Sequence, residues 1–144
     1  MTEVEALVVC KLAPLRTRRD IAMLGLIRRS ILGRGPKQLR DLFQLQQREA
    51  QLRHTRIAAR RHRLQVVEFE GQQDYVRRSI WGLITIYNLL PSYVVEECAT
   101  VRDFQGALQD LVMQRAIAGC QDWQDTLSPR LPLAGHPLVS LLMG

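Results

Sequence analysis

The side chains best suited to chemistry in this sequence are the arginines of residues 48–63, REAQLRHTRIAARRHR. This segment contains six arginines and a single acidic residue, Glu49. An arginine side chain presents a planar fork of N–H donors that matches the oxygens of a phosphate group, so a dense run of arginines favours binding to a polyanion. The candidate nucleic-acid contacts are Arg48, Arg53, Arg56, Arg60, Arg61 and Arg63.

The conformation of residues 48–63 decides what these arginines can reach. As a helix, the segment would be about 24 Å long. Arg53, Arg56 and Arg60 would then share one face, as on a helix that follows a phosphate backbone. The segment is also compatible with an exposed, partly disordered linker whose arginines make no specific contact. Both interpretations stay open at this point.

Metal binding and phosphate-loop chemistry are poorly supported. His54 and His62 lie eight residues apart, without a cysteine or an acid at a spacing that suits zinc. Glu68 and Glu70 lack a third ligand nearby in the sequence, so a solvated strand face is the better interpretation. Loop 33–37, GRGPK, has glycines and a lysine, but its proline offers no N–H to a phosphate and the loop follows a predicted helix instead of a strand.

No catalytic pattern emerges either. The sequence has no G-x-S-x-G nucleophile elbow, and no histidine lies beside any of the three cysteines. An enzyme would require the fold to bring together distant side chains such as Glu68, His136 and Cys120. We therefore expect a non-catalytic protein that uses no cofactor and no metal.

Charge is distributed unevenly along the chain of 144 residues. Residues 1–63 contain 15 basic and 5 acidic side chains, a net charge of +10, whereas residues 64–144 contain 5 basic and 9 acidic ones, a net charge of −4. A basic half joined to a mildly acidic half favours a polyanion-binding surface on one side of the molecule. The alternative is that the arginines solvate helices and pair with the acidic half.

The composition, with 47% hydrophobic and 24% charged residues, is typical of a soluble globular chain. No segment approaches the roughly 20 apolar residues of a membrane span, and the acidic N-terminus, MTEVEALVVCKL, is unlike a signal or transit peptide. Cys10, Cys98 and Cys120 form no CxxC pair, which fits a reducing compartment. We expect an intracellular protein, cytoplasmic or nuclear, with no membrane partner.

Hydrophobic periodicity predicts the first elements that would position these side chains. A helix is expected over residues 14–33, with Ile21, Leu24, Ile27 and Ile31 on its apolar face and Arg28 at the edge of that face. A second, short helix should begin at Pro36. Residues 64–70, LQVVEFE, alternate with a period of two and predict an edge strand or extended arm, with Val67 on one face and Val66, Glu68 and Glu70 on the other.

Residues 74–91, DYVRRSIWGLITIYNLLP, are predicted to form the central core helix. Its second half is apolar on nearly every side, so it must be buried on every side. Pro91 should end this helix, and Asn88 is a candidate polar contact near that end. One more helical turn is expected in SYVVEE, and a last helix over residues 100–118, which Thr100 would cap.

These elements predict an all-α fold: a small helical bundle of about four helices with an arginine-rich linker, a short extended arm and an irregular C-terminal tail. Residues 1–12 would be a lead-in segment, either one strand or the end of something longer. Residues 13–118 would be the helical domain, including the basic linker or helix at 48–63. Residues 119–144 would be the irregular tail, which contains prolines and glycines and could dock on the domain through Trp123 and the apolar run at 138–143.

Two long segments, PLRTRRDIAMLGLIRRSILGRGP and RRSIWGLITIYNLLPSYVVEECATVRDFQGALQDL, are joined by the arginine-rich link. Together they resemble the region that follows the polymerase domain in non-LTR (LINE-like) retrotransposon reverse transcriptases. In that family a basic helix near P-L-x-x-R-R ends in glycine, and a later R-S…Y-N-x-L-P segment precedes a V-x-x-F-x-x-x-L helix. The match covers roughly residues 12–115, at Pro14, Leu15, Arg18, Arg19, Gly33, Arg78, Ser79, Tyr87, Asn88, Leu90, Pro91, Val101, Phe104 and Leu108.

This resemblance implies a helical, non-catalytic accessory region that assists template or target binding in a reverse transcriptase polyprotein. The chain lacks an aspartate-pair polymerase box, an endonuclease segment and a Cys/His knuckle, so it would be a remnant or an accessory C-terminal region. RNA or DNA, and the remainder of the polyprotein, are the implied partners. The alternative hypothesis is a small helical protein-interaction module that binds an acidic partner through the basic segment.

Overall fold

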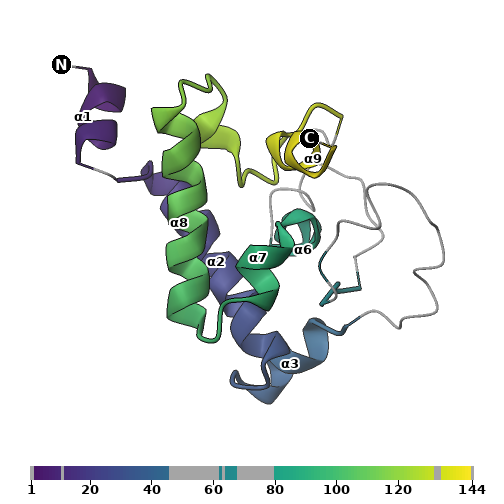
Figure 1. Ribbon diagram of the computed structural model, residues 1–144. Coiled ribbons are helices and arrows are strands. Elements are labelled where there is room, and N and C mark those ends of the chain that lie inside the picture. The colour runs from purple at the N-terminus through teal and green to yellow at the C-terminus, as the bar shows by residue number, and fades with distance from the viewer. Residues whose placement is uncertain are drawn as a thin grey trace.

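Helices dominate the computed structural model (Figure 1), which describes residues 2–10, 12–45, 62, 64–67, 80–131 and 134–143. The predicted all-α fold is confirmed. None of the described helices combines the length and the apolar character needed to cross a membrane. In chain order they are α1 (Glu3–Val9), α2 (Leu15–Ile31), α3 (Lys37–Leu42), α6 (Ile80–Leu89), α7 (Ser92–Glu96), α8 (Val101–Ile117) and α9 (Pro137–Met143), with the short 3-10 helix η2 (Trp123–Asp125) before α9.

Local sequence signals set the ends of the two longest helices, α2 and α8. Pro14 is the N-cap of α2, and the hydroxyl of the α8 N-cap, Thr100, accepts a hydrogen bond from the Asp103 N–H at 3.0 Å. Beyond the two C-termini, Gly33 and Gly119 adopt φ angles of 76° and 82°, a conformation that only glycine adopts at little cost. Both helices therefore begin and end close to where the sequence predicts.

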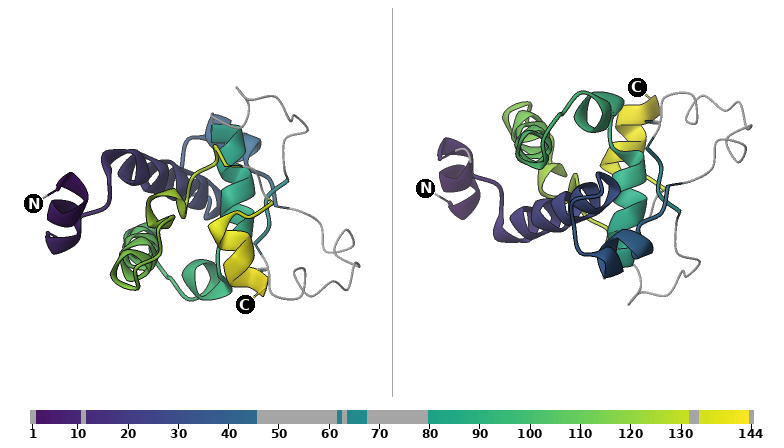
Figure 2. Two further views of the ribbon diagram at one scale, coloured as in Figure 1. Left: turned by 90° about the horizontal axis from the view of Figure 1, so that it is seen from above. Right: turned by 90° about the horizontal axis from the view of Figure 1, so that it is seen from below.

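Helices α2 and α8 are in contact and run in opposite directions. In Figure 2 α8 is seen nearly end-on, with α2 crossing beside it. The Gln105 amide donates to the Ile21 carbonyl at 3.5 Å, and the Arg28 guanidinium donates to the Cys98 carbonyl at 3.4 Å, so positions rise along α2 as they fall along α8. A Cβ atom at Gly25 would overlap the Gln105 side chain. The missing side chain of Gly25 therefore permits this close approach.

Helix α6 occupies the centre of the core, as predicted for residues 74–91, although residues 74–79 lie outside the described part of the chain. It packs against α2 on one side and α9 on another, while α7 packs against α8. Because its apolar side chains point in all directions, a single contact surface could not bury them. The buried side chains of this region are Leu83, Ile84, Ile86, Tyr87, Leu89 and Leu90.

The C-terminal tail corrects the expectation of an irregular segment over residues 119–144. Helix η2 packs on α8, and helix α9 packs on α6. Trp123, Leu127 and Leu138 belong to the main hydrophobic core, so the expected docking of Trp123 is confirmed. The prolines of the tail suggested irregular structure, but Pro137 is the first residue of α9, where a helix needs no backbone N–H.

The lead-in segment forms helix α1, not the strand considered from the sequence. Thr2 and Glu5 make a capping box: the Thr2 hydroxyl accepts from the Glu5 N–H at 3.1 Å, and the Glu5 carboxylate accepts from the Thr2 N–H at 3.0 Å. Helix α1 contacts α8, as Figure 1 shows, and its last residue, Val9, is 68% exposed.

Candidate functional site

The two ends of the arginine-rich region meet at one place, which we call the neck and define as Gln44, Leu45, Val66 and Val67. The Val67 N–H donates to the Gln44 carbonyl at 2.8 Å, and Leu45 and Val66 form an isolated antiparallel bridge. Asn88 of α6 completes the neck, because its amide nitrogen donates to the Val66 carbonyl at 2.8 Å and its amide oxygen accepts from the Val66 N–H at 2.7 Å. A buried side-chain amide thus pairs with Val66 as a neighbouring strand would.

Two further contacts hold the neck on α6. His62 Nδ1 accepts from the Leu64 N–H at 3.2 Å, so His62 Nε2 carries the proton and donates to the Tyr87 carbonyl at 2.8 Å. The Gln65 amide donates to the Asn88 carbonyl at 3.0 Å. The carbonyls in the last turn of a helix have no N–H partner within the helix. The chain around His62 and Gln65 supplies these partners at the end of α6.

The predicted contact residues, Arg48, Arg53, Arg56, Arg60, Arg61 and Arg63, lie outside the described residues. The structure describes the neck, whose residues flank this segment in the sequence on both sides. Contact between these arginines and a nucleic acid stays a prediction.

The extended arm differs from the prediction in which face is buried. Val66 is fully buried and Val67 is 51% exposed, so the expected alternation is present between these two residues. The sequence placed Val66 on the same face as Glu68 and Glu70, which we interpreted as solvated. That assignment is wrong for Val66, because its backbone pairs with Asn88 inside the core. Glu68 and Glu70 themselves lie outside the described residues.

A second basic surface covers α2, α3 and the joint between them. Of the two acids in this part of the chain, Asp20 is buried 3.5 Å from Arg130, and only Asp41 is exposed. Burial raises the pKa of Asp20, and the Arg130 charge opposes that rise. The periodicity places most of these basic residues on polar faces, but sequence reasoning did not group them as a site. The exposed members are Arg16, Arg18, Arg19, Arg29, Arg34, Lys37 and Arg40.

Arg28 departs from its predicted place at the edge of the apolar face of α2. Its side chain is only 4% exposed, and the guanidinium lies 6.0 Å from the centre of the Phe104 ring. Two of its nitrogens, Nε and Nη1, have no hydrogen-bond partner in the part of the chain that the structure describes. Burial raises the pKa of Tyr87, and the neighbouring Arg28 guanidinium opposes that rise. Arg28 therefore carries its charge into the core, where a contact with an aromatic ring replaces an ion pair.

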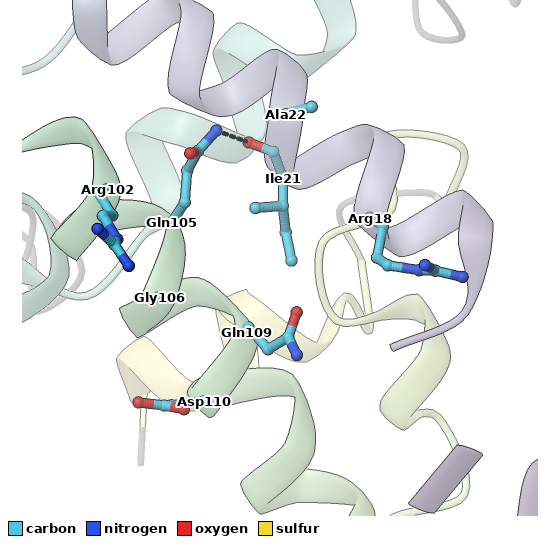
Figure 3. A pocket seen from close by; sticks show the side chains of 8 residues that line it. All are labelled: Arg18, Ile21, Ala22, Arg102, Gln105, Gly106, Gln109 and Asp110. Carbon is cyan, nitrogen blue, oxygen red and sulfur yellow. Dashed lines mark hydrogen bonds between the residues drawn. The ribbon is translucent and has the colours of Figure 1, made fainter. Parts of the chain in front are cut away.

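A groove of about 500 Å³ lies on the surface where α2 meets α8 (Figure 3). Figure 3 shows the side chains of Ile21, Gln105 and Gln109 between the two helices. No cysteine, serine or histidine lines it. The lining residues are Arg18, Ile21 and Ala22 from α2 and Arg102, Gln105, Gly106, Gln109 and Asp110 from α8.

His136, considered from the sequence for an enzyme site, has a structural role. Its Nδ1 accepts from the Leu138 N–H at 3.1 Å, so its Nε2 carries the proton and donates to the Ser128 carbonyl at 2.8 Å. Burial lowers the pKa of His136. With both nitrogens bonded to the backbone, the ring is not available as a general base. Within the described ranges, no group of three or more His, Cys, Asp or Glu side chains could hold a metal ion.

Comparisons with protein-family models, curated proteins and solved structures found no match for this chain. The likeness to the retrotransposon region therefore depends on the sequence motifs alone.

Proposed function

We propose that this chain is a non-catalytic, nucleic-acid-binding accessory region, or a remnant of one, of the kind that follows the polymerase domain in non-LTR retrotransposon reverse transcriptases. Its phosphate contacts would be the arginines of residues 48–63. The observation that supports this proposal best is the neck, which gives the arginine-rich segment a fixed base on the helical core.

Positive charge is concentrated in the sequence beside the neck, because six arginines fall within residues 48–63. Arg40 and Lys37 of α3 precede the neck by only a few residues and are exposed. Clustered positive charges of this kind raise the local potential and attract a polyanion from a distance.

The motif and the neck coincide at the end of α6. Tyr87 and Asn88 belong to the Y-N-L-L-P element, the most distinctive part of the resemblance. The same two residues supply the carbonyls that bond His62 and Gln65, and Asn88 also pairs with Val66. Anchoring the basic segment would be a physical reason for the Y-N-L-L-P element. This role supports the proposed relationship to the retrotransposon region.

Salt-dependent binding to a labelled oligonucleotide tests the proposal. Six phosphate contacts should give a slope of roughly −5 for log K against log salt concentration, at about 0.9 per phosphate on duplex DNA. Replacing Arg53, Arg56, Arg60 and Arg61 by Gln should make the slope shallower by about 3 to 4 units.

A matched variant distinguishes specific contacts from net charge. Replacing Arg16, Arg19, Arg34 and Arg40 by Gln removes the same number of charges from the described helical surface. This variant should weaken binding but change the slope less than the first one does. An unchanged slope in the first variant would contradict the proposal.

A further inference from the structure

The groove between α2 and α8 continues along exposed positions of both helices, and among the described elements α1 also contacts α8. At 100° per residue, positions 15, 18, 22 and 29 of α2 fall within about 60° of one another, so Leu15, Arg18, Ala22 and Arg29 share one face. All four are exposed. Positions 102, 106 and 117 of α8 share a face in the same way, and Arg102, Gly106 and Ile117 are also exposed.

The antiparallel packing gives this surface two chemically different ends. Leu15 begins α2 and Ile117 ends α8, so both lie at one end, where they are 58% and 71% exposed. At the other end, Arg29 comes near the C-terminus of α2 and Arg102 lies in the first turn of α8. One end is therefore apolar and the other carries two exposed guanidinium groups.

Two small residues leave the middle of the surface open. Ala22 and Gly106 line the groove there, and a Cβ atom built at Gly106 would meet nothing within 4 Å. Small residues let another helix approach closely, since the distance between helix axes depends on the side chains at the contact. The amides of Gln105 and Gln109 lie beside this opening, as Figure 3 shows.

We propose that this surface binds an amphipathic helix of an acidic partner protein. The segment from Arg102 to Ile117 is about 22 Å long, which matches a partner helix of about 15 residues. Its apolar side chains would pack on Leu15 and Ile117, and its carboxylates would pair with Arg29 and Arg102. The C-terminus of the partner helix lies at the arginine end, because the negative end of its dipole adds to the charge of the carboxylates.

A nucleic acid fits this surface less well than an acidic helix. The Leu15–Ile117 end presents two exposed apolar side chains, which an apolar helix face can bury and a phosphate backbone cannot. The proposal also uses none of the arginines of residues 48–63, so it does not depend on the nucleic-acid function.

Fluorescence anisotropy with a designed peptide tests the proposal on the full chain. The probe is a labelled helical peptide of about 15 residues, with leucine and alanine on one face and glutamate in its last two turns. A matched peptide carries lysine in place of each glutamate. The wild-type chain should bind the glutamate peptide at least about tenfold more tightly than the lysine peptide.

Three substitutions locate the site. Gly106→Leu fills the opening without a steric clash and should weaken binding about tenfold or more. The double substitution R29E/R102E should reverse the preference, so that the lysine peptide binds more tightly. The control, Arg40→Glu, lies outside the groove and should change the affinity by less than about twofold.

Circular dichroism of each variant verifies that it keeps the wild-type fold. The proposal is overturned if the glutamate peptide fails to bind, if both peptides bind equally, or if Gly106→Leu and R29E/R102E leave binding unchanged. A loss of oligonucleotide binding in Gly106→Leu, without peptide binding by the wild type, would assign the groove to nucleic acid instead. The variant lacking Arg53, Arg56, Arg60 and Arg61 should keep peptide binding, which separates this proposal from the first one.

Discussion

At the scale of single residues, a few buried polar side chains determine which chain segments pack on the apolar helices. Asn88 is 1% exposed and satisfies both backbone groups of Val66, which is fully buried. A buried N–H or C=O group without a partner costs about 1–3 kcal/mol. The two hydrogen bonds from Asn88 offset this cost for Val66, so the neck can be buried. The apolar contacts of α6 alone would not select this register.

Asn88→Ala should therefore lower the free energy of unfolding by about 2–4 kcal/mol, because it removes both hydrogen bonds to Val66 and creates a cavity. Equilibrium unfolding in urea measures the change. The control is Gln44→Ala, whose exposed side chain bonds only to the Asp41 carbonyl at 3.2 Å and should cost less than about 0.5 kcal/mol. Equal effects of the two substitutions would show that Asn88 does not support the neck.

His136 should make stability depend on pH. Its pKa is lowered in the folded protein, chiefly by burial, although the Ser128 carbonyl and the charges of Asp125 and Asp122 oppose the change. Below an ordinary pKa of about 6.5 the unfolded chain binds more protons than the folded one, so stability falls as the pH drops through the folded pKa.

Unfolding in urea at pH 7.5 and at pH 5 measures this effect in the wild type and in His136→Gln. The wild type should lose more stability between these two conditions than the variant does, because the variant has no ring to protonate. Contributions from the other histidines are common to both chains and cancel in the comparison. An identical loss in both chains would rule out this role for His136.

At the scale of elements, glycine has opposite effects on stability in the interior of a helix and just beyond its end. Gly106 lies inside α8 and faces open space, whereas Gly119 follows α8 with a φ angle of 82°. A Cβ atom meets nothing within 4 Å at either position, so the backbone conformation alone separates them. This pair therefore isolates helix propensity from packing.

Gly106→Ala should stabilise the protein by about 1 kcal/mol, since alanine loses less backbone entropy in a helix. Gly119→Ala should destabilise it by about 1 kcal/mol, since a left-handed conformation strains an L-residue. Thermal unfolding should show shifts of about 4 °C in opposite directions. Shifts of the same sign would mean that the two substitutions act through something other than the backbone.

At the scale of the whole molecule, the tail is part of one core. Trp123, Leu127 and Leu138 pack in the same hydrophobic cluster as α2, α6 and α8. The tail is also tied to α2 by the bond from the Thr17 hydroxyl to the Gln124 carbonyl at 3.2 Å and by the ion pair of Asp20 with Arg130. Among the described side chains of helix α1, in contrast, only the partly buried Val8 packs against the cluster.

A chain that ends at Gly119 should therefore lose its cooperative thermal transition and bind a hydrophobic dye. Removing the three buried tail side chains costs about 5–9 kcal/mol at about 1.5–3 kcal/mol each, which is comparable with the whole stability of a small domain. The control, removal of residues 1–10, should leave a cooperative transition. If the chain lacking its tail unfolds cooperatively at the wild-type temperature, the tail is not part of the core.

The amino-acid sequence by itself determined the spans of α2, α7 and α8 and the C-terminal end of α6, because caps, prolines and apolar periodicity act within one or two turns of the chain. The tertiary structure alone decided the rest. The neck joins Val66 to Asn88, 22 residues apart, and the tail joins Thr17 to Gln124, 107 residues apart. Such pairings depend on which surfaces meet when the core is buried, and the local sequence pattern does not encode which surfaces these are. The same holds for the buried face of Val66 and for the helices in the tail.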